Sequence, residues 1–387
     1  MNNNTEENKL KRSKKFAVAF LDFVTCFFLA MSLFFAGEAI NTSLPYYQEE
    51  TSNISRLEND LTDLVVSSKL SYIKGDGYLA QTKDMASSYI LSLTYTSVDI
   101  EKRNDEMFKN VTEINEDKDN LYFYYSSYVK DNQSNFSDFS KIKTIDKYKE
   151  DLLKESKSGD NSIFVTEGYP FFTNETANEI YSFLVEGKQT SSTKYNLVYD
   201  AYSKLLEEAI SQYMELFIPY VNLVNEHSST LDHFYQVKIG ILLGCFFISI
   251  LIIYFLIPVC LKDGRTLFMK IFRLKAISVD EGKITWPFNL LRAISLFFIY
   301  LFSTSLIALI VLGGYNGLIT IYTVFLGIFN LLFLSVLSIL LTICSMLFTF
   351  FRKNKKQTFS EFISLMIVKE DDSKKTITVG DKTFEIQ

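Results

Sequence analysis

The chain has 387 residues, of which 48% are hydrophobic and 22% charged, with a net charge of −6 and a mean hydropathy of +0.10. A positive mean hydropathy beside so many charges indicates that apolar and polar residues occupy separate stretches. The sequence has no P-loop, nucleophile elbow, glycine-rich phosphate cradle or CxxC pair, so we expect no enzyme, no catalytic residue and no cofactor or metal.

Four apolar runs are long enough to cross about 30 Å of hydrocarbon at roughly 1.5 Å per residue. The predicted spans cover residues 16–37, 238–261, 288–312 and 318–351. A basic stretch before the first run would also suit a cleaved signal peptide, but that run contains Asp22 and exceeds the usual apolar core of about 7–15 residues. We therefore expect a retained anchor. The fourth run is too long for one straight span, so its ends must tilt or protrude, or the helix breaks near Gly327 or Asn330.

The distribution of charge predicts the orientation. Residues 38–237 hold 33 acidic and 18 basic side chains, whereas the stretch from Leu261 to Arg292 holds seven basic and three acidic ones. Short basic loops stay on the cytoplasmic side, while a long acidic region can be translocated. We expect a multi-pass protein of the cell membrane with residues 1–15, 262–287 and 352–387 in the cytoplasm and residues 38–237 outside. The basic loop suits anionic lipid headgroups better than nucleic acid.

The sequence of residues 38–237 predicts an independent helical domain. Apolar residues recur at helical spacing in two stretches, and Pro219 is expected to kink or end the second helix. Residues 225–237 are then expected to continue as a helix into the second span. These residues are Ile54, Leu57, Leu61 and Leu64, and Tyr202, Leu206, Ile210, Tyr213 and Phe217. None of the four cysteines lies in this region, so its stability owes nothing to disulfides.

Short β-hairpins are predicted on the cytoplasmic side. Residues 274–279 and 283–286 flank a turn at 280–282, and residues 376–379 and 383–386 flank a second turn. The predicted fold class is therefore an all-α integral membrane protein with four transmembrane helices, a helical extracytoplasmic domain and small cytoplasmic β-hairpin elements.

Three separated segments resemble the RDD family of bacterial membrane proteins, named for one Arg and two Asp. The matching positions are Arg12 with Asp22, then Gly264, Thr266, Leu267, Lys270, Gly282 and Arg292, and finally Thr358 and Glu361. The chain departs from the family pattern at Phe268, where Gly is favoured, at Glu361, where the second Asp is expected, and at residues 364–366, which replace small residues. The resemblance covers about half the chain, since residues 38–237 have no counterpart in compact members. It implies a multi-pass membrane fold and leaves the activity undetermined, with transport or ion exchange as the function usually suggested for the family.

Asp22 and Arg292 are the strongest candidates for a functional site. Asp22 lies about 10 Å from the end of its span and Arg292 about 9 Å from the same side of the membrane. Opposite charges at matching depth predict an intramembrane ion pair between the first and third spans. We favour a role in helix packing, and the alternative is a titratable gate for protons or cations.

A second candidate is a row of hydroxyl side chains on the fourth span. The residues are Ser335, Ser338, Thr342, Ser345 and Thr349, which share one helical face. Small hydroxyl residues allow helices to pack closely, which is the favoured interpretation, and the alternative is the lining of a narrow polar path.

Two classes of function remain open. The first is transport or ion exchange. The second is a non-transporting receptor or scaffold, or a permease-like subunit of an ABC system, whose external domain binds an envelope partner. The partners expected are membrane lipids and either a second copy of the chain or another membrane protein.

Overall fold

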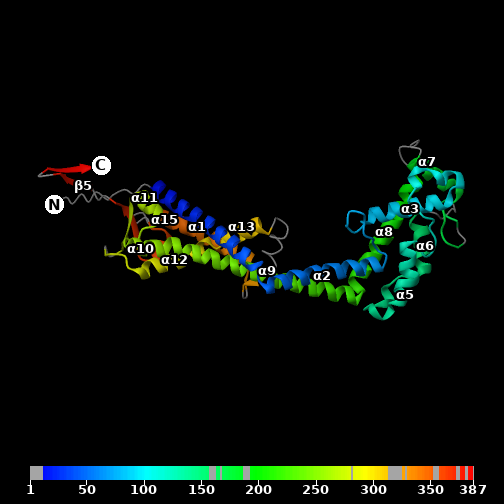
Figure 1. The fold of residues 1–387 in the computed structure, drawn as a ribbon, viewed down its shortest axis with the longest axis horizontal. Coiled ribbons are helices and arrows are strands. Elements are labelled where there is room, and N and C mark those ends of the chain that lie inside the picture. Colours follow the sequence, from blue (N-terminus) through cyan, green and yellow to red (C-terminus); the bar gives the residue numbers. More distant parts are fainter. Residues whose placement is uncertain are drawn as a thin grey trace. The chain divides into compact units, whose positions relative to one another are not determined.

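The computed structural model describes residues 12–156, 163–165, 168–185, 192–279, 282–312, 325–326, 329–351, 357–371, 375–379 and 382–386. The chain divides into two compact units. We call residues 1–50 with 230–387 the apolar unit, and residues 51–229 the polar unit. Figure 1 follows the chain from its blue N-terminal helix to its red C-terminal strands.

Long apolar helices make up most of the apolar unit, and Figure 1 shows α1, α12 and α15 among them. The elements are α1 (Arg12–Asn41), α9 (Ile218–Leu251), η7 (Ile252–Leu256), α10 (Ile257–Leu261), α12 (Trp286–Tyr300), α13 (Phe302–Val311) and α15 (Leu331–Phe351). Among the described residues, three helical stretches are long and apolar enough to cross a membrane, or four if the bent pair α12 and α13 counts as one span. η7 is a π-helical turn directly before Pro258, which has no amide hydrogen to donate.

The helix predicted over residues 288–312 is bent, which was not expected from the sequence. α12 and α13 meet at Leu301 with a bend of 54°. The helix of the fourth apolar run begins at Leu331, which agrees with the predicted alternative of a break near Asn330 rather than with one helix from residue 318. A short hairpin of β2 (Phe325–Leu326) and β3 (Phe329–Asn330) precedes it, and Asn330 Oδ1 accepts a hydrogen bond of 2.8 Å from the Phe333 amide. This cap accounts for the helix start. Residues 318–324 and 327–328 lie outside the described residues.

The strand after the second span pairs differently from the prediction. β1 (Leu274–Ser278) runs antiparallel to β4 (Met366–Glu370), with Ala276 opposite Val368. The predicted partner, residues 283–286, forms no strand. The pairing with β4 buries Leu274 and Ala276 against Met366 and Val368 in a small core, which a local hairpin could not provide. Two short helices, α11 (Leu267–Ile271) and α16 (Phe359–Ile363), adjoin these strands. The last predicted hairpin is confirmed by β5 (Lys375–Val379) and β6 (Lys382–Ile386).

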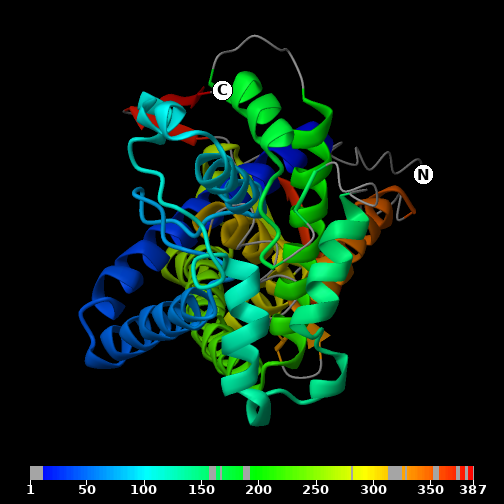
Figure 2. The same ribbon diagram turned by 90° about the vertical axis from the view of Figure 1, so that its right-hand side faces the viewer.

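The polar unit is mostly helical, as predicted. Its elements include α2 (Pro45–Ser67), α3 (Thr82–Ser97), η1 (Ile100–Asn104), η2 (Glu106–Phe108), α4 (Asn120–Phe123), η3 (Tyr124–Tyr128), α5 (Val129–Asp131), η4 (Gln133–Asn135), η5 (Phe139–Lys141), α6 (Ile145–Glu155), α7 (Asn174–Leu184) and α8 (Thr193–Leu216). Figure 2 shows its cyan and green helices from another side. α8 packs against α3 and α6 around one aromatic-rich core. Pro219 follows the end of α8, as expected.

A buried carboxylate organises the core of the polar unit. Asp119 accepts hydrogen bonds from the hydroxyls of Tyr169 (2.9 Å), Tyr148 (3.2 Å) and Tyr202 (3.3 Å). It also accepts bonds from two backbone amides at the start of α4, so it serves as the N-cap of that helix. Burial raises the pKa of Asp119 above its usual value, although these hydrogen bonds act in the opposite direction.

Candidate functional site

The apolar unit contains a cavity of about 640 Å³. Its walls include three parts of the chain that are far apart in sequence: α1, the region from α11 to α13, and the region around α16. Residues of η7 and α15 complete the lining. The charged residues on its walls are Lys15, Asp22, Arg292 and Glu361. The three segments that carry the family-like positions therefore meet around a single cavity.

Asp22 lies on the wall of this cavity and is only 1% exposed. Its Oδ2 accepts a hydrogen bond of 2.7 Å from Thr266 Oγ1. The Phe268 amide also faces the carboxylate, but Oδ1 has no hydrogen bond of ordinary geometry in the described part of the chain. Thr266 is the N-cap of α11, since its Oγ1 accepts from the Met269 amide at 3.3 Å. One hydroxyl thus fixes both the start of α11 and the position of the Asp22 carboxylate.

Arg292 lies on the wall of the same cavity and is 7% exposed. Its Nη1 donates to Met269 Sδ at 3.6 Å, and its guanidinium carbon lies 5.4 Å from the centre of the Tyr254 ring. The predicted ion pair between Asp22 and Arg292 is not formed, because Thr266 supplies the side-chain hydrogen bond to Asp22 and Arg292 rests against sulfur and an aromatic face. Nε of Arg292 has no hydrogen-bond partner among the described residues.

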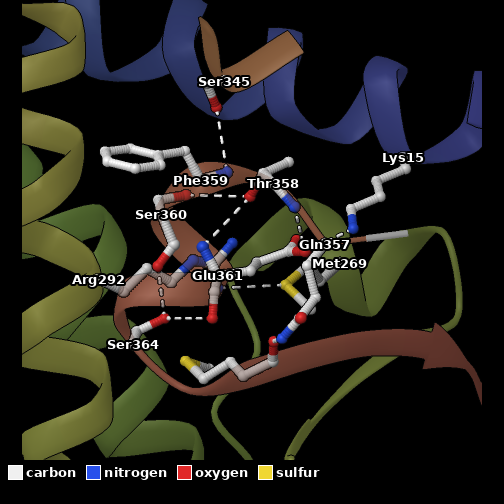
Figure 3. A network of polar contacts seen from close by, with 11 residues as sticks. Lys15, Met269, Arg292, Ser345, Gln357, Thr358, Phe359, Ser360, Glu361 and Ser364 are labelled. Atoms are coloured by element: carbon white, nitrogen blue, oxygen red, sulfur yellow. Dashed lines mark hydrogen bonds and ion pairs between the residues drawn. The ribbon is translucent and has the colours of Figure 1, made fainter. Parts of the chain in front are cut away.

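Glu361 lines the cavity, and Figure 3 shows the network of polar contacts around it. Its Oε2 lies 2.5 Å from Lys15 Nζ, and both side chains are largely buried. Glu361 and Thr358 also form a capping box at the start of α16, in which each side chain accepts from the other residue's amide. The sequence analysis missed the pairing with Lys15. The feature of the sequence that could have indicated this pairing is Glu361 in place of the family's Asp. The longer side chain of Glu can reach both a backbone amide and a cation.

The remaining family-like positions have structural roles or face outward. Gly264 has φ +68°, and an added Cβ would meet Ile284 at 3.0 Å, so both its conformation and its surroundings require glycine. Leu267 and Lys270 are exposed on α11. The Gly282 carbonyl accepts from the Ser278 amide at 3.3 Å. Arg12 is the first residue of α1, and its side chain lies outside the described residues.

The hydroxyl row on α15 supports the break in the third span. Ser338 Oγ donates to the Ile299 carbonyl at 2.6 Å and accepts from the Phe302 amide at 3.0 Å. Thr342 Oγ1 donates to the same carbonyl at 2.9 Å. These hydroxyls satisfy backbone groups that the bend would otherwise leave unpaired in an apolar setting.

The other members of the row contribute to helix packing. Ser335 and Ser305 share a hydrogen bond between α15 and α13. Ser345 Oγ accepts from the Phe359 amide at 3.3 Å and so joins α15 to α16. The side chain of Thr349 lies outside the described residues. Thr342 and Ser345 also line the cavity, so part of the row combines packing with a polar wall.

Within the described residues, no group of three or more His, Cys, Asp or Glu side chains could hold a metal ion. In comparisons with known proteins, the model of the RDD family matches residues 214–364. No curated protein and no solved structure matches the chain. The matched range contains the α11, α12 and α16 walls of the cavity, whereas Arg12, Lys15 and Asp22 lie before it. The chain therefore carries an RDD family domain at residues 214–364.

Proposed function

We propose that this membrane protein exchanges a small cation for protons and that Asp22 is the group for which they compete. The observation that carries the proposal is a carboxylate 1% exposed, with one oxygen unbound, on the wall of a cavity. A buried carboxylate that forms no close ion pair is stabilised by taking up a proton or by binding a small cation, because burying a charge is costly. Exchange requires at least two states of the same carboxylate, one in which a proton neutralises it and one in which the small cation does.

The break in the third span supports this proposal. Ile299, Tyr300 and Phe302 line the cavity at the point where α12 ends and α13 begins. Transporters commonly place their binding sites beside interrupted helices, since backbone groups released at an interruption can be satisfied by a cavity or by neighbouring polar side chains. Here α15 supplies those side chains. A bend whose backbone groups are hydrogen-bonded to two side-chain hydroxyls can also change its angle more readily than a continuous helix can.

The flux of protons and cations in proteoliposomes tests the proposal. We expect an imposed cation gradient to move protons in vesicles holding the full chain, and Asp22→Asn to abolish the movement. Thr266→Val, which removes the hydrogen bond but keeps the acid, should change the pH dependence. The groups that face Asp22 in the cavity, Arg292, Tyr254 and Tyr300, remain in both variants. Asp263→Asn, which alters a carboxylate outside the cavity, is the control. Equal flux in all variants contradicts the proposal.

We further propose that both termini and the loop after the second span are cytoplasmic and that the polar unit is extracytoplasmic. The excess of basic residues outside the polar unit supports this orientation. Ser134→Cys and Lys270→Cys place single thiols at exposed positions of the two units in a background without the native cysteines. A membrane-impermeant reagent applied to intact cells or spheroplasts should label the thiol at 134 alone. Labelling of both would contradict the orientation.

A non-transporting receptor or scaffold is the second candidate function. The observation that favours it is that the polar unit has a core of its own, large enough to form an independent binding domain. Under this alternative, an envelope partner or an ATPase subunit co-purifies with the chain, and Asp22→Asn has no effect on function.

A further inference from the structure

The mouth of the cavity lies on an apolar surface. Phe16 and Phe20 of α1 are 62% and 54% exposed, and Met346 of α15 is 51% exposed, although all three line the cavity. Both helices are long and apolar enough to span a membrane. In a bilayer, large apolar side chains exposed on such helices face acyl chains. The mouth formed by these side chains therefore faces lipid.

The inner wall of the cavity is charged. Lys15 is paired with Glu361, so its ammonium is neutralised within the wall. Arg292 is nine-tenths buried, makes no ion pair with a carboxylate among the described residues, and has an unpartnered Nε. A guanidinium group presents a planar set of donors that fits a carboxylate at two points. A buried guanidinium without such a partner is a ready site for an anionic head.

We propose that the cavity binds a single-chain carboxylate amphiphile, of the fatty-acid class, drawn from the bilayer. The carboxylate reaches Arg292, and the hydrocarbon chain leaves through the mouth along Phe16, Phe20 and Met346. A volume of about 640 Å³ is in the range that holds one small ligand. A small carboxylate can reach a nearly buried side chain where a large headgroup cannot. This inference does not rest on ion exchange.

At the place where the head would lie, Arg292 favours an anionic head over a cationic one. An ammonium head at the same place would meet Arg292, a fixed positive charge that stays protonated. The carboxylate oxygens of Glu361 and Asp22 are in part already engaged, by Lys15 and by Thr266. Mouth and inner wall together therefore match an apolar chain that ends in a carboxylate.

Equilibrium binding of radiolabelled oleate to the purified full chain in nanodiscs tests the inference. We expect saturable binding that unlabelled oleate displaces and that oleyl alcohol and oleylamine do not. Arg292→Gln should weaken binding about tenfold or more, because it removes the charge-assisted contact. Arg265→Gln is the control, since that arginine pairs with Asp371 and does not line the cavity. Displacement by the alcohol at equal concentration would overturn the proposed recognition of the head.

A second variant keeps the test decisive if Arg292→Gln does not fold. Met346→Trp keeps the exposed mouth apolar but narrows it, and should weaken oleate binding while Arg292 and the rest of the inner wall stay unchanged. Unchanged oleate binding in this variant contradicts the inference, as does displacement of oleate by phosphatidylglycerol, which would assign the site to a phospholipid. A protein that binds oleate but exchanges no cations leaves the inference intact and ends the proposed function. Cation exchange without oleate binding would overturn the inference and leave the proposed function intact.

Discussion

Lys15 Nζ lies 2.5 Å from Glu361 Oε2, so two residues 346 positions apart share a largely buried ion pair. This pair joins the first turns of α1 to the capping box that begins α16. It also forms one end of the cavity whose walls include Asp22 and Arg292. Because Glu361 caps its own helix and neutralises Lys15 at once, the position of α16 against α1 depends on one carboxylate.

Breaking this pair should destabilise the protein strongly. Removing one partner of a buried ion pair leaves an uncompensated charge, which costs about 3–5 kcal/mol. We therefore expect Glu361→Gln and Lys15→Met each to lower the thermal unfolding midpoint in detergent, and the double variant to lose less than the sum. The pair Lys14 with Glu370 is the matched control because it is far more exposed, and Glu370→Gln should cost less than about 1 kcal/mol. Equal losses at the two sites would rule out a special role for Lys15 and Glu361.

Ser338→Ala tests the support of the broken span. The substitution leaves the Phe302 amide and part of the Ile299 carbonyl's bonding unmet, at a cost of about 1–3 kcal/mol for a buried group. Thermal unfolding in detergent should show this loss, and the change should be larger in the double variant with Thr342→Val. Ser32→Ala is the control, since that exposed hydroxyl bonds only within its own helix. If Ser338→Ala and Ser32→Ala behave alike, α15 does not stabilise the bend.

Cysteine cross-linking tests the pairing of β1 with β4. Ala276 and Val368 are directly opposite in the antiparallel register, and their side chains lie on one face of the sheet. In a background without native cysteines, the pair Ala276→Cys with Val368→Cys should cross-link rapidly with a short bifunctional reagent. Ala276→Cys with Ile367→Cys should react slowly, because successive side chains of a strand point to opposite faces. Rapid reaction of the second pair would indicate a register shifted by one residue.

The polar unit should lose stability at neutral pH when a tyrosine hydroxyl is removed from Asp119. Tyr169→Phe removes a hydrogen bond to a buried carboxylate, which contributes about 1.5–3 kcal/mol. Tyr195→Phe is the control, because that ring is only partly buried and does not contact Asp119. Chemical unfolding of the full chain, followed by tyrosine absorbance or fluorescence, measures the difference.

The pH dependence of that loss has a definite sign. The pKa of Asp119 is raised in the folded state, so the folded unit keeps a proton over an interval in which the unfolded chain has lost it. Its contribution to stability is therefore complete below the unfolded pKa and declines as pH rises through the folded pKa. The deficit of Tyr169→Phe should shrink as pH falls, because the protonated carboxyl needs fewer donors. A deficit that grows toward acid pH would contradict this account of Asp119.

Several features of the fold could be predicted because they depend on local pattern. Apolar runs located the long helices, the spacing of Tyr202, Leu206 and Tyr213 identified the buried face of α8, and Pro219 marked its end. The hairpin of β5 and β6 follows from its turn residues. The resemblance to the family also singled out Asp22, Thr266 and Glu361, although it did not predict that their segments meet around one cavity.

Features that depend on a choice among distant partners could not be predicted. β1 pairs with β4 about ninety residues later, because Met366 and Val368 bury Leu274 while the nearby residues 283–286 offer no such core. The bend at Leu301 occurs without Pro or Gly. The hydroxyls of α15 form hydrogen bonds with the backbone groups that the bend would otherwise leave unpaired. Asp22 bonds to Thr266 rather than Arg292 because the cap of α11 brings a hydroxyl closer. The depth of Asp22 in the membrane, taken alone, does not distinguish Thr266 from Arg292 as its partner.

Proton release on cation binding tests most directly whether Asp22 is the group for which cations and protons compete. Sodium, lithium or potassium chloride is added to the purified full chain in weakly buffered detergent solution, with choline chloride as the control for ionic strength, and the pH change is recorded. We predict saturable release of no more than one proton per chain with at least one of the small cations, and none from Asp22→Asn. Equal release from the wild type and Asp22→Asn, or no release from the wild type with any of these cations, would contradict the account.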